Sequence, residues 1–232
     1  MDLLICTSPI ALLWDIDGTL LNTQGIAAQQ LMDSFMEITG CKCSIQSGQY
    51  SGFTDFEIVL NLLQKADQEV EISTAEAVLI HYGTRLLPEL EKNPPRLLAD
   101  VQLAFQELTD FPNVKHYIGS GNSILGAESK IKAAGLTRYF PKQNYFIATS
   151  SQISRDSVIR SAAINIKIPT LVIGDSDRDI HSARNNNLPV LAVATGHHTY
   201  RELSELNPNY LLDDSWATED LLKIILDFAK NH

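Results

Sequence analysis

The sequence predicts a parallel α/β fold, and two features of its apolar pattern carry that prediction. First, short strand-like apolar runs alternate with segments of helical periodicity from about residue 95 onward. Such alternation indicates βαβ crossovers, which build a parallel sheet covered on both faces. Second, residues 22–94 show apolar residues at helical spacing, directly after the first strand-like run. We therefore expect an α/β core of residues 1–21 and 95–232, with an all-helical cap domain of residues 22–94 inserted into it.

The elements of the core are placed by apolar runs that stop at turn residues. Strands are expected at 10–14, 114–119, 145–148, 170–174 and 189–194 and, at one edge of the sheet, 210–212. Helices are expected at 97–108, 124–134, 158–164, 180–185 and 221–229. In the insert, Thr54 and Glu57 have the spacing of a capping box, which predicts a helix start. Pro88 and the run 93–95 are expected to end the helical block.

The composition describes an ordinary globular protein of 232 residues, long enough for a core domain and a smaller insert. No apolar run approaches the roughly 20 residues of a membrane span. The N-terminus lacks the basic start of a secretory signal, and the three cysteines fit reduced thiols, so we expect a cytoplasmic protein. The net charge of −10 argues against nucleic acid or an anionic membrane as a partner, because phosphate groups attract basic surfaces.

The clearest functional signal lies at the end of the first strand. The apolar run stops at Asp15 and Asp17, which flank one isoleucine and precede Gly18 and Thr19. Side chains two residues apart in a strand point the same way, so both carboxylates share one side of the backbone. Two converging carboxylates repel each other and need a cation or a proton to coexist. Gly18 allows the tight exit that presents them to a ligand.

Polar side chains also follow two later strands. They are Ser120, Gly121 and Asn122 after the strand at 114–119, and Asp175, Asp177 and Asp179 after the strand at 170–174. The first group leads into a helix N-terminus, which suits a phosphate oxygen. Arg155, near the start of the helix behind the third strand, offers a fixed cation. Because ligands of open parallel sheets bind beyond the carboxyl ends of the strands, these residues are expected to form one site.

This combination resembles the phosphohydrolases of the haloacid dehalogenase superfamily, over the whole chain except its first few residues. The resemblance rests on Asp15-Ile16-Asp17-Gly18-Thr19 as the nucleophile motif, Ser120 as the second motif, and Gly174-Asp175 with Asp179 as the metal motif. The stretches 120–122, 133–136 with 139–140, and 193–196 are similar to those of phosphoglycolate-phosphatase-like members. The resemblance implies a Rossmann-like parallel sheet core with a helical cap.

The resemblance also implies a Mg²⁺-dependent phosphatase that hydrolyses a small phosphate monoester through an aspartyl phosphate. Asp15 would be the nucleophile, and Asp17 would protonate the leaving group and then activate water. The phosphate would be bound by Ser120, Gly121, Asn122 and Arg155, and the metal by Asp15, the backbone carbonyl of Asp17, Asp175 and Asp179. Four carboxylates around a phosphate repel one another without a divalent cation, and hard oxygen ligands indicate Mg²⁺.

Three assignments stay open at this point. Most members of the superfamily carry a lysine as the third-motif cation, and here Arg155 is the candidate, with Lys142 and Arg160 as alternatives. Asp177 is either a metal ligand or an acid that stabilises a helix start. In the segment 48–55, Gly52 and Thr54 either reach the substrate or form a capped interhelical turn.

The insert is acidic, with ten acidic and four basic residues between Thr23 and Asn93. This favours a small phosphorylated metabolite over a polyphosphate as substrate, and Arg85 or Lys42 is the candidate partner for a substrate carboxylate. A phosphomutase of the same superfamily, similar to β-phosphoglucomutase, is the alternative function. A receiver-type domain with a phosphorylated aspartate and an inactive binding protein are the further alternatives. A monomer or a homodimer is expected.

Overall fold

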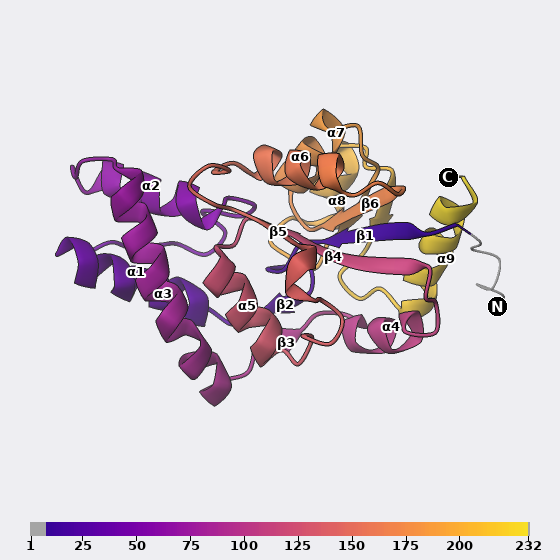
Figure 1. The fold of residues 1–232 in the computed structure, drawn as a ribbon, viewed down its shortest axis with the longest axis horizontal. Helices are drawn as coiled ribbons and strands as arrows, with labels where there is room; N and C mark the ends of the chain where they lie inside the picture. Colours follow the sequence, from indigo (N-terminus) through magenta and orange to yellow (C-terminus); the bar gives the residue numbers. More distant parts are fainter. Residues whose placement is uncertain (1–7, 232) are drawn as a thin grey trace.

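The computed structural model describes residues 8–231 (Figure 1). Residues 1–7, with Cys6 and the whole N-terminal start, and His232 lie outside the described residues. Within the described range, six strands form one parallel sheet in the order β5-β4-β1-β6-β7-β8. The strands are β1 (Ile10–Trp14), β4 (Val114–Ser120), β5 (Tyr145–Ile147), β6 (Thr170–Gly174), β7 (Val190–Val193) and β8 (Tyr210–Leu212). The predicted parallel α/β fold is therefore confirmed, and each strand lies within one residue of its expected bounds.

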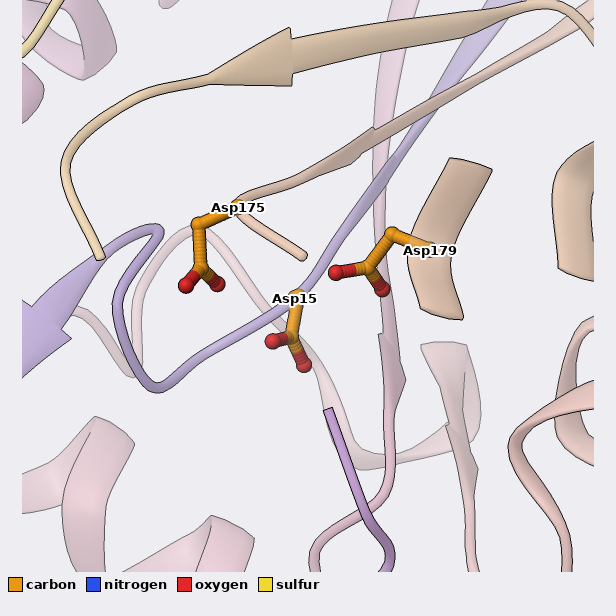
Figure 2. Close-up of side chains that lie close together, drawn as sticks. All are labelled: Asp15, Asp175 and Asp179. Atoms are coloured by element: carbon orange, nitrogen blue, oxygen red, sulfur yellow. The ribbon is translucent and has the colours of Figure 1, made fainter. Parts of the chain in front are cut away.

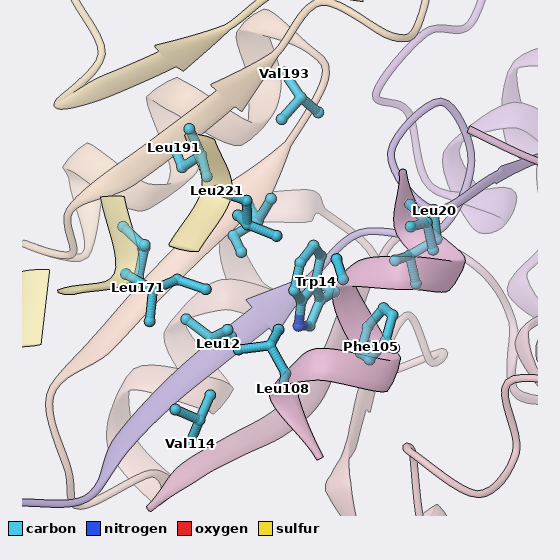
Figure 3. Close-up of a cluster of buried hydrophobic side chains, with 14 of the residues drawn as sticks. Leu12, Trp14, Leu20, Phe105, Leu108, Val114, Leu171, Leu191, Val193 and Leu221 are labelled. Carbon is cyan, nitrogen blue, oxygen red and sulfur yellow. The ribbon is translucent and has the colours of Figure 1, made fainter. Parts of the chain in front are cut away.

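Strand β1 lies at the centre of the sheet because all five of its side chains are apolar and buried. Leu12 and Trp14 pack into the larger hydrophobic cluster on one face (Figure 3), and Ala11 and Leu13 pack into a second cluster on the other. The helices divide in the same way between the two clusters. On the first face lie α4 (Val101–Leu108), α5 (Ile124–Ala133) and α9 (Thr218–Lys230), and on the second α6 (Arg155–Asn165), α7 (Asp177–Asn185) and α8 (Tyr200–Glu205).

The start of α4 corrects one expectation. The helix predicted at 97–108 begins only at Val101, because Ala99 adopts a φ of 40°, which no α-helix continues. The preceding residues form β3 (Arg96–Leu97), which pairs antiparallel with β2 (Leu21–Asn22). This short ribbon lies where the chain leaves and re-enters the core (Figure 1), and the division at residues 22 and 94 stays a prediction. Helix α8 was not predicted, although Thr199 and Glu202 form its capping box.

In the described chain between β2 and β3, the regular elements are three helices, α1 (Ile26–Thr39), α2 (Asp55–Lys65) and α3 (Ile72–Lys92). They share a hydrophobic cluster, which Ala148 and Val158 of the core also join, and lie beyond the carboxyl ends of the strands (Figure 1). We call these helices and their connecting loops the cap. Thr54 and Glu57 form the predicted capping box of α2.

Pro88 does not end the helical block, as the sequence pattern suggested, but lies inside α3. A proline in a helix interior removes one backbone hydrogen bond and strains the preceding turn. Here Leu86 and Leu90 on either side of it are fully buried in the cap cluster, and this packing holds the last turn in place. The helix continues to Lys92. No helix within residues 8–231 combines the length and apolar character needed to cross a bilayer.

Candidate active site

Three buried carboxylates meet at the carboxyl edge of the sheet. Asp15 follows β1, Asp175 follows β6, and Asp179 lies in the first turn of α7. Strands β1 and β6 are paired in parallel, and the Asp15 backbone N–H donates to the Ile173 carbonyl at 2.9 Å, which fixes the strand ends side by side. One oxygen of each carboxylate lies within 4.8 Å of the others, and Figure 2 shows the three side chains close together. We call them the acidic cluster.

Arg155 is the cation that the structure brings to this cluster. Its buried guanidinium lies 2.9 Å from Asp15 Oδ1 and also contacts Asp179. The two alternatives lie elsewhere: Lys142 pairs with Glu128 at 2.8 Å, and Arg160 with Asp156 at 2.7 Å, both on the surface. One guanidinium thus faces three carboxylates. The cluster keeps a deficit of positive charge.

The pKa values of Asp15 and Asp175 are consistent with this deficit of positive charge. Burial raises the pKa of Asp15 to about 6, opposed by Arg155 and reinforced by Asp179. Burial, and then the charges of Asp179 and Asp15, raise the pKa of Asp175 well above its usual range. A group of buried carboxylates with raised pKa values gains stability from added positive charge.

The donor set of the cluster fits a small divalent metal ion. Its three buried carboxylates offer the hard oxygen ligands that Mg²⁺ prefers. The backbone around Asp175 is shaped for its carboxylate, because a Cβ added at Gly18 or Gly196 would lie 2.4 Å or 1.7 Å from Asp175 Oδ2. Gly18 also has a φ of 81°. Thr19 Oγ1 donates to Asp175 Oδ1 at 3.2 Å, which orients the group.

Asp17 lies outside the acidic cluster and belongs to a second set of charges. Its Oδ2 accepts hydrogen bonds from Lys130 Nζ at 2.5 Å and Asn122 Nδ2 at 2.8 Å. Lys130 is buried and also donates to the Tyr82 hydroxyl of α3. Sequence reasoning missed Lys130; its signal is a lysine between Ala127 and Ile131 on the buried face of α5.

The second predicted motif lies between these two sets of charges. The buried Ser120 hydroxyl accepts a hydrogen bond from Asn122 Nδ2 at 2.9 Å and lies beside Asp15. Gly121 lies where the cap meets the core, because its carbonyl accepts from the Asp55 N–H at 2.9 Å. A Cβ at this position would lie 2.9 Å from Thr54 Cα. Gly121 therefore permits the close approach of the cap.

The two cap residues singled out from the sequence have different places. Gly52, with a φ of 71°, lines the cavity and lies against the start of α7, where a Cβ would come within 2.6 Å of Ser176 Oγ. Thr54 does not line the cavity. Its hydroxyl accepts from the Glu57 N–H at 3.1 Å and donates to the Ile153 carbonyl at 2.5 Å. For Thr54 the structure supports the alternative reading, a helix cap.

Asp177 likewise takes the second of its two readings. It lies in the first turn of α7, outside the acidic cluster, and is 45% exposed with His198 Nε2 at 3.7 Å. A carboxylate at this position stabilises the helix N-terminus.

A cavity of about 660 Å³ connects these groups. Asp15, Asp17, Ser120, Arg155 and Asp175 lie at its core side, and residues of the cap close the other side. Every residue predicted for catalysis or phosphate binding, from both strand-end motifs and Arg155, lines it. Asp179 lies behind Asp15 and Arg155.

Fold and site together define a class: a parallel α/β protein with an acidic site at the carboxyl edge of its sheet, beneath a helical cap. A sequence model of the haloacid dehalogenase-like hydrolases matches residues 12–193. The chain belongs to this family of hydrolases, which confirms the resemblance found in the motifs. A search of curated proteins finds no significant match.

Solved structures similar to this chain share its fold at low sequence identity. A predicted phosphatase from Clostridium acetobutylicum matches with a TM-score of 0.72 and 18% identity, over 95% of this chain and all of that one. A predicted phosphoglycolate phosphatase from Haemophilus somnus matches with a TM-score of 0.66 and 17% identity, over 95% and 98%. A β-phosphoglucomutase from Clostridium difficile matches with a TM-score of 0.67 and 15% identity, over 95% and 97%.

Proposed function

We propose that this hydrolase is a Mg²⁺-dependent phosphatase that cleaves a small phosphate monoester through an aspartyl phosphate on Asp15. The observation that carries the proposal is the position of Asp15. Its carboxylate lines the cavity between core and cap, with Arg155 and the Ser120 hydroxyl beside it and Asp17 two residues further on. A nucleophile, a phosphate-binding group and a second carboxylate thus share one space.

In the first step, an Asp15 oxygen attacks phosphorus, and the bond from phosphorus to the ester oxygen breaks. Asp17 gives its proton to the departing alkoxide, which leaves as an alcohol. In the second step, Asp17 takes a proton from a water molecule, whose oxygen attacks the aspartyl phosphate and releases inorganic phosphate. The hydrogen bonds from Lys130 and Asn122 hold the Asp17 carboxylate toward the cavity in which both proton transfers take place.

Mg²⁺, when bound by Asp15, Asp175, Asp179 and the backbone carbonyl of Asp17, would supply Lewis-acid stabilisation of phosphoryl oxygens. Arg155 and Ser120 would stabilise the charge that develops on those oxygens. Gly18 and Gly196 hold the backbone clear of the Asp175 carboxylate and so keep its oxygens available.

The test is phosphate release from a panel of monoesters, including p-nitrophenyl phosphate, with Mg²⁺ or with EDTA. Asp15→Asn is expected to lower turnover by about a thousandfold or more, and Asp17→Asn by about a hundredfold. Asp177→Asn is the matched control, because it removes an acid from the same edge but outside the acidic cluster, and it should leave turnover unchanged. Full activity of Asp15→Asn, or activity undiminished in EDTA, would refute the proposal.

The phosphomutase alternative makes a different product. A mutase returns the phosphoryl group to a second hydroxyl of its substrate, so isomer forms without net phosphate release. The cap-side wall of the cavity bears on this choice, because a bisphosphorylated intermediate needs cations that hold its second phosphate. Among the described residues, none of the lysines or arginines of the cap lines the cavity. This lack of cap lysines and arginines among the described lining residues supports hydrolysis over the mutase reaction.

A further inference from the structure

Part of the cap-side wall of the cavity is formed by aliphatic side chains. Helix α1 presents Ala28, Leu31 and Met32 from successive turns of one face, and Ile45 and Ile58 complete this surface. Leu31 belongs to the buried cap cluster, and Ile45 and Ile58 pack against it only in part. Aliphatic side chains at this wall are therefore held by the cap core on one side and face the cavity on the other.

The same wall carries no positive charge within the described residues. Asp55 is its one charged lining residue, and its carboxylate is taken by the Ser123 N–H at 2.8 Å and hydroxyl at 2.9 Å. None of the four basic residues of the cap lines the cavity. Arg85 pairs with Glu37, Lys65 hydrogen bonds to Tyr50, Lys92 pairs with Glu89, and Lys42 lines a separate surface pocket. The cations that the sequence offered for a substrate carboxylate, Arg85 and Lys42, are thus misplaced for that task.

The basic residues that do line the cavity belong to the core, and the two strong cations are already engaged. Arg155 faces Asp15 and Asp179, and Lys130 faces Asp17 and Asp55. His197 lies against the Gly48 turn of the cap. An anionic group on the leaving alcohol would therefore enter a space that has aliphatic side chains on its cap side and, among the described residues, no free lysine or arginine, and burying an unpaired charge is costly.

We propose that the leaving group is an uncharged alcohol with an apolar portion that packs on Ala28, Met32, Ile45 and Ile58. This inference rests on the proposed phosphatase function and narrows its substrate class. It disfavours monoesters of hydroxy acids and sugar bisphosphates. Neutral polar side chains such as Gln24 and Gln46 also line the cavity, and they can accept hydroxyl groups without requiring a charge.

The test compares two esters of equal size, 3-methylbutyl phosphate and the phosphate ester of 3-hydroxypropanoate. They differ in one branched end, which is an isopropyl group in the first and a carboxylate in the second. The wild-type enzyme is expected to show a kcat/KM at least about tenfold higher for the methylbutyl ester. A ratio near one, or a preference for the carboxylate, would overturn the inference even while phosphate release from either ester upholds the phosphatase.

A charge added to the wall provides the second arm. Met32→Lys is expected to shift the ratio of the two kcat/KM values toward the carboxylate ester by about tenfold. Ile80→Lys adds the same charge on the exposed face of α3, away from the cavity, and should leave the ratio unchanged. If Met32→Lys does not fold, Ala28→Lys tests the same face. If the ratio of the two kcat/KM values is the same in the wild type, Met32→Lys and Ile80→Lys, the inference is contradicted. If no monoester releases phosphate, the inference falls together with the proposed function.

Discussion

Two sets of charges border the same cavity, and they are balanced differently. The acidic cluster sets Asp15, Asp175 and Asp179 against the single cation Arg155. The second set, which we call the interface set, places Lys130 of the core between Asp17 and the cap residue Asp55.

The two sets also differ in how their carboxylates are satisfied. In the interface set, both carboxylates accept hydrogen bonds. Asp17 accepts from Lys130 and Asn122, and Asp55 accepts from Ser123. Burial by itself would lower the pKa of Lys130, but the charges around it, that of Asp17 first, together with the hydrogen bond to Asp17 outweigh burial and hold the pKa above its usual range. Its ammonium therefore stays charged. The interface set is complete in itself and positions Asp17, whereas the acidic cluster is built to receive charge from outside.

The largest expected effect comes from removing the cation of the acidic cluster. Arg155→Met leaves three buried carboxylates without a cation and removes a group that would face the phosphate. We expect kcat/KM for phosphate release to fall by about a hundredfold or more. Arg160→Met, on the exposed side of the same helix, is the control and should retain wild-type kinetics. Wild-type activity in Arg155→Met would show that the cluster does not depend on this cation.

A second prediction tests whether the interface set is structural as well as positioning. Lys130→Met leaves the buried Asp55 and the partly exposed Asp17 without their cation, and we expect the free energy of unfolding to fall by about 2 kcal/mol in urea denaturation. Lys132→Met, two residues away and exposed, should change it by less than about 0.5 kcal/mol. Adding Asp55→Asn to Lys130→Met should recover part of the loss, because one of the stranded charges is removed. Additive losses in the double variant would exclude this coupling.

The acidic cluster was accessible to sequence reasoning and the interface set was not, for a physical reason. Asp15, Asp175 and Arg155 each stand next to the end of a strand or the start of a helix, and the parallel topology alone brings such ends together. Strand bounds at 10–14, 170–174 and 210–212 were predicted to the residue, because those runs are apolar and end sharply.

Lys130, by contrast, meets Asp17 across 113 positions of sequence, from the middle of a helix. No local pattern specifies such a contact. The β2–β3 ribbon was missed because two residues per strand carry no periodicity. Pro88 was misread because burial of Leu86 and Leu90 outweighed a local helix-breaking signal. Tertiary packing decided each of these cases, and sequence periodicity does not report it.

A third prediction tests whether the acidic cluster, in contrast to the interface set, binds an added cation. Mg²⁺ at a hundred times its dissociation constant is expected to stabilise the fold by about 2.7 kcal/mol, which corresponds to a rise in Tm of about 5 °C or more. Asp175→Asn should weaken this response in thermal unfolding, whereas Asp177→Asn should preserve it. An undiminished response in Asp175→Asn would remove Asp175 from the ligands.

The last prediction concerns protons in place of metal. Burial raises the pKa of Asp15 from 3.8 to about 6, so the folded state holds this proton more tightly than the unfolded chain does. Stability from this group is therefore fully present below pH 3.8 and is lost as the pH rises toward 6.

In EDTA, the free energy of unfolding of the wild type should fall by at most about 3 kcal/mol between pH 4 and 6, relative to that of Asp15→Asn. The variant serves as the reference because its neutral amide mimics the protonated acid and does not titrate. The measurement is urea unfolding of both proteins across this range. Saturating Mg²⁺ should flatten the difference, since the metal supplies at pH 6 the positive charge that the proton supplied at pH 4. The opposite result, in which the wild type gains stability relative to Asp15→Asn as the pH rises without metal, would contradict this prediction. It would mean that Arg155 alone balances the acidic cluster, and the contrast with the interface set would then disappear.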